Sequence, residues 1–159
     1  MNVERLLEVA MSSVDSEMGG ALCLSKGGWE GWLQCEMWRT ISLVDAQSVE
    51  REVPYPDGGG ARCDLVVSAR PDREEPALWI ELKAFGAFRE GDEHAFLDLV
   101  ALDLQKLDQT PSKARAVLLF VVPKAIGVEL REALQDRGWN LDYEESANAA
   151  YFGRVFDQP

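Results

Sequence analysis

The sequence is short of the residues that build most zinc centres and many hydrolase active sites. It has one histidine, His94, and three widely spaced cysteines, Cys23, Cys35 and Cys63. A single histidine leaves little material for a zinc site or a histidine-based hydrolase. Cysteines set among apolar neighbours at such spacings are typical of small core residues in a reducing compartment. We therefore expect no disulfide framework, and we expect His94 to be an exposed residue at a helix start.

Basic runs and long apolar segments are also missing. The chain has 16 Lys and Arg against 28 Asp and Glu, which gives a net charge of -12. Because phosphate neutralisation depends on clustered Lys and Arg, this charge argues against a simple nucleic-acid binder. No apolar stretch is long enough to cross a bilayer, and no charged leader precedes an apolar signal segment. We therefore expect a cytoplasmic protein without a membrane partner.

The residues that are present favour one folded domain over 1–159. The chain is 47% hydrophobic and has five tryptophans, and no linker or internal repeat divides it. Hydrophobic periodicity predicts helices over 3–14, 29–43, 94–108 and 127–137, and strands over 49–55, 63–68, 77–83 and 116–122. Segments 140–143 and 151–156 are predicted as edge strands, and the segment between the glycine pairs at 19–20 and 27–28 has no assignment.

The segment Glu81-Leu82-Lys83, at the end of the apolar run 77–80, is the most informative feature. Successive strand residues point to opposite faces, so Glu81 and Lys83 project together while Leu82 faces the other way. Ionised groups on a core-bound strand are costly unless they are paired or used. This strand therefore predicts either a site or a structural ion pair.

The preceding strand adds a second carboxylate. If the connection between the two strands is centred near Asp72 and Arg73, Asp64 falls opposite Lys83 or close to it. Asp64, Glu81 and Lys83 would then meet at one end of one face. A slip of one residue would put Asp64 on the other face, so the register tests the prediction.

These residue types suit one chemistry. Oxygen ligands from Asp64 and Glu81, with the backbone carbonyl of Leu82, would hold Mg²⁺ (or Mn²⁺) with several waters. Lys83 would stabilise charge developing on a phosphate or orient a water molecule. The alternative is a buried or edge ion pair between Lys83 and either acid.

The two strand segments, 62–67 (Arg-Cys-Asp-Leu-Val-Val) and 79–83 (Trp-Ile-Glu-Leu-Lys), resemble the core signature of the PD-(D/E)XK nuclease superfamily. The resemblance implies an α/β fold with a restriction-endonuclease-like αβββαβ core, in which helices flank a central mixed sheet. It also implies metal-dependent hydrolysis of phosphodiesters.

The same resemblance implies an acidic residue on the first core helix, where Glu30 and Glu36 both qualify. They lie about 120° apart around the helix axis, so only one can face the site. Glu30 is preferred because it lies on the same side of the helix as Met37 and Ile41. The alternative is that neither belongs to a site and that both are ordinary helix glutamates. Some members place a glutamine or lysine on the later helix, which gives Gln105 and Lys106 a role in orienting phosphate or water, unless they form a solvated helix end.

Two function classes follow. The first is a nuclease or nuclease subunit in restriction, repair or defence, binding nucleic acid weakly alone and assisted by a protein partner or a second copy. Arginines at 51, 62, 70, 73 and 89 could gather near its site. The second is an inactive nuclease-like fold that serves as an acidic inhibitor or immunity module for a basic partner. A binding module has no evident need for two acids and a lysine together, which favours the enzyme.

Overall fold

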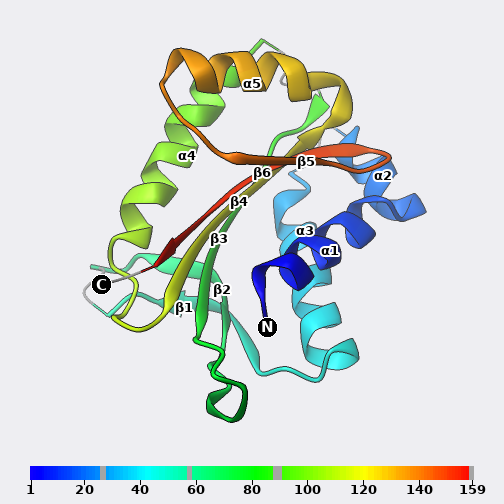
Figure 1. The fold of residues 1–159 in the computed structure, drawn as a ribbon. Coiled ribbons are helices and arrows are strands. Elements are labelled where there is room, and N and C mark those ends of the chain that lie inside the picture. Colours follow the sequence, from blue (N-terminus) through cyan, green and yellow to red (C-terminus); the bar gives the residue numbers. More distant parts are fainter. Residues whose placement is uncertain (26–27, 57–58, 88–90, 158–159) are drawn as a thin grey trace.

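A six-stranded mixed sheet runs through the molecule and carries helices on both faces (Figure 1). The structure is a computed structural model and describes residues 1–25, 28–56, 59–87 and 91–157. The strands are β1 (Val49–Pro54), β2 (Arg62–Val67), β3 (Leu78–Ala84), β4 (Arg115–Pro123), β5 (Asp142–Glu145) and β6 (Ala149–Asp157). The helices are α1 (Val3–Val14), α2 (Glu17–Cys23), α3 (Glu30–Arg39), α4 (Glu93–Leu107) and α5 (Gly127–Asp136).

The strands follow the order β1-β2-β3-β4-β6-β5 across the sheet. The pair β3 and β4 is parallel, and all the other neighbouring pairs are antiparallel. Helix α4 provides the crossover that a parallel pair requires. The prediction of an α/β protein with a mixed sheet flanked by helices is therefore confirmed.

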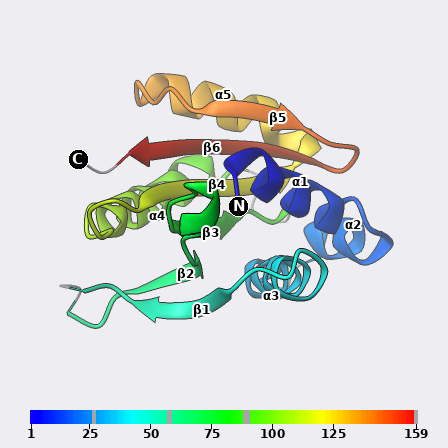
Figure 2. The same ribbon diagram turned by 60° about the horizontal axis from the view of Figure 1, so that its bottom comes forward.

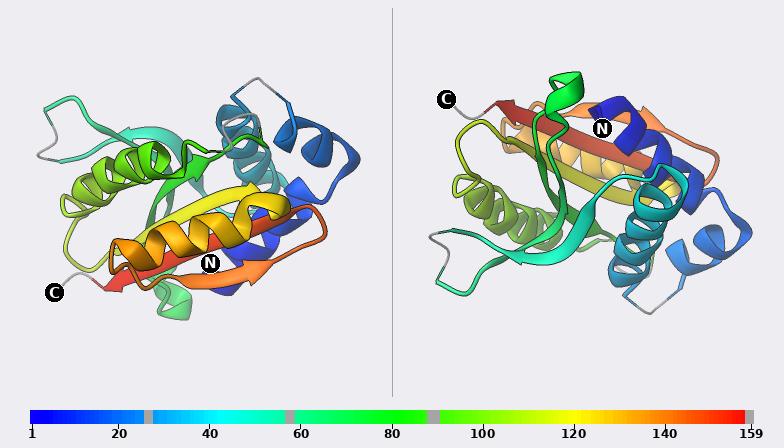
Figure 3. Two further views of the ribbon diagram at one scale, coloured as in Figure 1. Left: turned by 90° about the horizontal axis from the view of Figure 1, so that it is seen from above. Right: turned by 90° about the horizontal axis from the view of Figure 1, so that it is seen from below.

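The two faces of the sheet pack against different helices, as Figure 2 and Figure 3 show. Helices α1 and α3 bury Leu6 and Leu33 with Ile80 and Leu82 of β3. Helices α4 and α5 lie on the opposite face, where Phe96 packs with strand residues of β4 and β6. Strand β4 is buried along almost its whole length because it contributes side chains to both cores.

Strand β6 corrects the predicted arrangement of the last third of the chain. Segment 151–156 was expected to form an edge strand, but β6 lies between β4 and β5 and pairs with β4 from Arg115↔Asp157 to Pro123↔Ala149. The apolar residues Tyr151 and Phe152 point to opposite cores. Their alternation is that of an interior strand, so only β5 forms this edge.

Helix α2 occupies part of the segment that the sequence left unassigned. It begins after Ser16, whose hydroxyl accepts a hydrogen bond from the N–H of Gly19 at 3.0 Å. A methyl group at Gly19 would collide with the backbone of Ser13 and Val14. The glycine therefore permits a close approach between α1 and α2, a tertiary requirement that periodicity does not reveal.

Helix α3 is shorter than the predicted helix over 29–43. The α-helix ends at Arg39, and Thr40–Val44 continue as one π-helical turn. No helix within the described ranges combines the length and the apolar character needed to cross a bilayer.

Candidate functional site

The site forms where β2 and β3 separate. Their pairing ends with Leu65↔Ile80, although β2 continues to pair with β1 and β3 with β4. Continuing the register by one residue places Asp64 opposite Glu81, two residues before Lys83. The register is that of a connection centred on Asp72 and Arg73, so Asp64 lies close to Lys83 and not directly opposite it.

Asp64 closes the end of the β2–β3 ladder with its side chain. Its Oδ2 accepts a hydrogen bond from the backbone N–H of Leu82 at 2.7 Å. Its Oδ1 accepts one from Nε2 of Gln34 on α3 at 3.3 Å. The carboxylate is therefore held by two neutral donors, one from β3 and one from α3.

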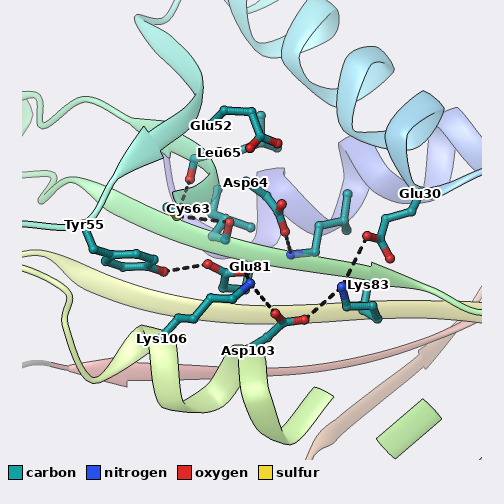
Figure 4. A network of polar contacts seen from close by, with 12 residues as sticks. Glu30, Glu52, Tyr55, Cys63, Asp64, Leu65, Glu81, Lys83, Asp103 and Lys106 are labelled. Atoms are coloured by element: carbon teal, nitrogen blue, oxygen red, sulfur yellow. Dashed lines mark hydrogen bonds and ion pairs between the residues drawn. The ribbon is translucent and has the colours of Figure 1, made fainter. Parts of the chain in front are cut away.

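Glu81 is fully buried and reaches toward α4 (Figure 4). Its Oε1 accepts a hydrogen bond from the hydroxyl of Tyr55 at 2.8 Å. Its Oε2 lies 3.1 Å from Nζ of Lys106. The phenol and the ammonium group fix the two oxygens of this carboxylate.

Lys83 connects the two helix layers. Its Nζ lies 3.3 Å from Oε1 of Glu30 on α3 and 3.1 Å from Oδ2 of Asp103 on α4. Oε2 of Glu30 also accepts a hydrogen bond from the backbone N–H of Ala84 at 2.9 Å. The alternative ion pair, between Lys83 and Glu81 or Asp64, is not the pairing that forms.

Asp103 joins the two lysines, because it pairs with Lys106 as well as with Lys83. These contacts form a continuous chain of polar groups from Tyr55 to Glu30 (Figure 4). We define the site cluster as Glu30, Tyr55, Asp64, Glu81, Lys83, Asp103 and Lys106.

Burial and like charge shift the titration of the carboxyl groups. Burial, with the charge of Asp64, raises the pKa of Glu81 to about 7. Burial, with the charge of Glu30, raises the pKa of Asp64 to about 6. Burial lowers the pKa of Lys83, but Glu30 and Asp103 raise it by more, so Lys83 stays protonated.

The charge balance and the donor types fit a hard divalent cation. The cluster holds four carboxylates and two ammonium groups, so two negative charges remain when all are ionised. Carboxylate oxygens are the donors that Mg²⁺ prefers, and Mg²⁺ keeps several waters beside one or two carboxylates. No set of three or more His, Cys, Asp and Glu side chains among the described residues is placed to hold a metal ion. A cation here would rely on the two carboxylates of Asp64 and Glu81 and on water.

The structure brings together five of the residues selected from the sequence: Glu30, Asp64, Glu81, Lys83 and Lys106. Two further candidates lie outside the cluster. Glu36 pairs with Arg39 of its own helix at 2.9 Å, and Gln105 is exposed beside Asp108 and Phe156. The exclusive choice between the two helix glutamates therefore falls on Glu30.

Three residues near the site were not selected from the sequence: Gln34, Tyr55 and Asp103. For Asp103 a signal exists, because it occupies the apolar face of α4 with Val100 and Leu107, three residues before and four after it. A carboxylate at such a position has to be paired. Gln34 and Tyr55 give no comparable signal.

The predicted arginines separate into two groups. Arg51 binds Oε1 of Gln34 at 2.6 Å, and Arg62 binds the carbonyl of Glu52 at 2.6 Å, so both lie beside the site. Arg70 and Arg73 pair with acids in the β2–β3 connection: Glu75 and Asp72. Arg89 lies outside the described residues.

Comparisons of this chain with protein-family models, with curated proteins and with solved structures gave no match.

Proposed function

We propose that this protein is a metal-dependent nuclease, or a nuclease subunit, with the restriction-endonuclease-like core of the PD-(D/E)XK superfamily. The element order α3-β1-β2-β3-α4-β4 supports this proposal, because it repeats the αβββαβ order that the resemblance implies. The main support for the proposal is one observation. The side chains of Asp64, Glu81, Lys83 and Glu30 lie together where β2 and β3 separate.

Asp64 and Glu81 would hold Mg²⁺ or Mn²⁺. When bound, the ion would polarise a phosphodiester and lower the pKa of a bound water. The protein's own contribution is to fix these groups. Tyr55 and Lys106 orient the Glu81 carboxylate, while Glu30 and Asp103 hold the ammonium group of Lys83.

We assign Lys83 to act on the substrate. Its side chain is 20% exposed, so the ammonium group is anchored but reachable from solvent. A fixed positive charge beside a phosphate stabilises the negative charge that develops during hydrolysis and costs little reorganisation. Glu30 and Asp103 keep Lys83 charged at neutral pH.

The substrate class is nucleic acid, and binding by the isolated chain is weak. The net charge of -12 opposes a polyanion, and the few basic groups beside the site limit the number of phosphate contacts. A protein partner or a second copy of the chain would supply the missing positive surface.

The test is cleavage of single-stranded, duplex and branched DNA and of RNA at low salt, with Mg²⁺ or Mn²⁺ and with chelator. We expect cleavage of at least one substrate that requires the metal. Glu81→Gln and Lys83→Ala should lower its rate about 100-fold or more while thermal unfolding stays cooperative. Glu36→Gln, a charge-neutralising change outside the cluster, is the matched control.

A second candidate function is an acidic module that binds a basic protein. The observation that favours it is that each lysine of the site cluster already has carboxylate partners, so the cluster is held together without a cation. Tight binding to a basic protein that survives Glu81→Gln, with no metal-dependent cleavage of any of the four substrates, would select this function.

A further inference from the structure

Gln34 is a buried amide that contacts the site from the side of α3. The residue is only 5% exposed. Its Nε2 lies 3.0 Å from the backbone carbonyl oxygen and 3.3 Å from Oδ1 of Asp64, and 3.1 Å from Oε1 of Glu52. One amide group therefore contacts two carboxylates on the adjacent strands β1 and β2.

Arg51 determines which way this amide points. Its guanidinium donates to Oε1 of Gln34 at 2.6 Å. Arginine has donors and no acceptor, so the amide oxygen has to face Arg51 and the amide nitrogen has to face Asp64 and Glu52. A flipped amide would place an N–H against a guanidinium and an oxygen against two carboxylates.

The backbone beside Asp64 is adapted to the same contact. Glu52 has a φ of +54°, which is unusual for a non-glycine residue inside a strand. The ladder between β1 and β2 pairs Arg51↔Leu65 and Val53↔Cys63 but omits the position between them, where Glu52 and Asp64 lie opposite each other. Residues in this conformation persist only where their surroundings hold them, and here Arg62 and Gln34 bind the carbonyl and the carboxylate of Glu52.

We propose that Gln34 is the positioning residue of the Asp64 carboxylate at a divalent-cation site, and that Arg51 acts through Gln34 by fixing its amide. The inference rests on the proposed function, because it assigns roles toward the cation that this function requires. Neither role requires contact with the reacting atoms. Both act on the orientation of one metal ligand.

A neutral donor is the suitable partner for such a ligand. Glu30, Glu81 and Asp103 all pair with lysines, whereas both oxygens of Asp64 bind neutral N–H groups. An amide fixes the rotamer of Asp64 without neutralising its charge, and each carboxylate oxygen keeps a lone pair for another partner. Of the two carboxylates that would hold the cation, Glu81 is already paired with Lys106, so a lysine at position 34 would neutralise the remaining one, Asp64.

The first experiment measures Mn²⁺ binding to the full chain by the electron paramagnetic resonance signal of free Mn²⁺. Loss of the contacts that orient a metal ligand costs about 10–100-fold in metal affinity. We therefore expect Gln34→Leu to weaken Mn²⁺ binding at least about 10-fold, and Gln47→Leu, at a half-buried glutamine that precedes β1, to leave it unchanged. If the wild type binds Mn²⁺ and Gln34→Leu binds it equally well, the inference is wrong and the proposed function stands. If the wild type binds no Mn²⁺, both are wrong.

Substitution of Arg51 distinguishes a positioning role from a simple electrostatic effect, because the two predict opposite changes in Mn²⁺ affinity. Removing a positive charge near a cation site should tighten cation binding. We expect the opposite, because Arg51→Leu frees the Gln34 amide to rotate. Arg51→Leu alone should weaken Mn²⁺ binding relative to the wild type. Added to Gln34→Leu, it should cause no further loss of affinity, because both changes act through the same amide. Arg51→Lys, which keeps a donor, should restore most of the affinity.

Because Arg51 is exposed, its variants can be measured even if Gln34→Leu does not fold. Tighter Mn²⁺ binding by Arg51→Leu, or additive effects in the double variant, would overturn the role of Arg51. Thermal unfolding without metal, measured in parallel, shows whether a change in affinity arises from loss of the fold.

Discussion

Nζ of Lys106 lies 3.1 Å from Oε2 of Glu81, so the fully buried carboxylate of the site is paired with a residue of α4 and not with Lys83 of its own strand. The two lysines therefore have different tasks. Lys106 compensates the charge of Glu81, and Lys83 is held by Glu30 and Asp103 near the point where β2 and β3 separate. Both lysines also pair with Asp103, which links the two arrangements.

Lys106→Met should destabilise the fold. The change leaves the charge of Glu81 buried without its ammonium partner, and we expect a loss of about 2 kcal/mol in the free energy of unfolding at pH 8, less than for a fully buried pair because Lys106 is one-third exposed. Urea denaturation measures it. Lys124→Met is the matched control, since Lys124 pairs with Glu145 at the same 3.1 Å on the surface and should cost less than about 1 kcal/mol. Equal losses would show that burial of Glu81 adds nothing to its pairing with Lys106.

The stability of the metal-free protein should fall as pH rises from 5 to 8. The pKa of Glu81 is raised from 4.5 to about 7 in the folded chain, so between these values the folded state holds a proton that the unfolded state has lost. The contribution of Glu81 to the free energy of unfolding is therefore fully present at low pH. It is lost as the pH rises through 7, and the total loss is up to about 3 kcal/mol. Urea denaturation in the presence of chelator at several pH values checks this expectation. Glu81→Gln should make the profile flatter, and an unchanged slope in that variant would contradict the assignment.

The two helix glutamates should differ in their effect on catalysis. Glu30→Gln removes the charge that binds Lys83, and we expect it to lower metal-dependent cleavage about 10–100-fold. Glu36→Gln should change the rate less than about twofold, because Glu36 pairs only with Arg39 on the same helix. Initial rates at saturating Mn²⁺ compare the two variants. Similar losses in both would remove Glu30 from the site.

Two glycine substitutions should have effects of opposite sign. Gly19→Ala forces a methyl group against the backbone of Ser13 and Val14 and should cost about 1–3 kcal/mol. Gly31→Ala lies in the first turn of α3 with open space around it and should stabilise by about 0.5 kcal/mol. Thermal unfolding of the two variants against the wild type measures both. Equal shifts would show that the approach of α2 to α1 is not constrained by Gly19.

Much of the fold could be predicted because its signals are local. The apolar run 116–122 indicates a strand buried on both faces, and Gly138, with a φ of +68°, follows the end of α5, where a glycine is typical of a helix end. The placement of β6 inside the sheet could not be predicted, since it depends on which strand pairs with β4. The start of α2 depends on a close approach between helices, which leaves no periodic pattern.

The site was predictable to the extent that its charges lie on predicted strands. Asp64, Glu81 and Lys83 were found because ionised residues interrupt apolar strands. Asp103 was missed, although a carboxylate on the apolar face of α4 is the same kind of signal in a helix. Gln34 is polar and uncharged, so its importance depends on Arg51 and Asp64, which only the tertiary structure brings near it.

The ion pairs of Lys83 tie together two layers that pack independently. Glu30 belongs to α3, whose apolar residues pack on one face of the sheet, and Asp103 belongs to α4, whose apolar residues pack on the other. The position of the ammonium group therefore depends on the thickness of both layers. A cavity made in the core of either helix layer, far from any charged residue, would shift the carboxylate of Glu30 relative to that of Asp103. The ammonium group of Lys83 would then move although the protein remains folded. The geometry of the site cluster would then respond to core packing on both sides of the sheet.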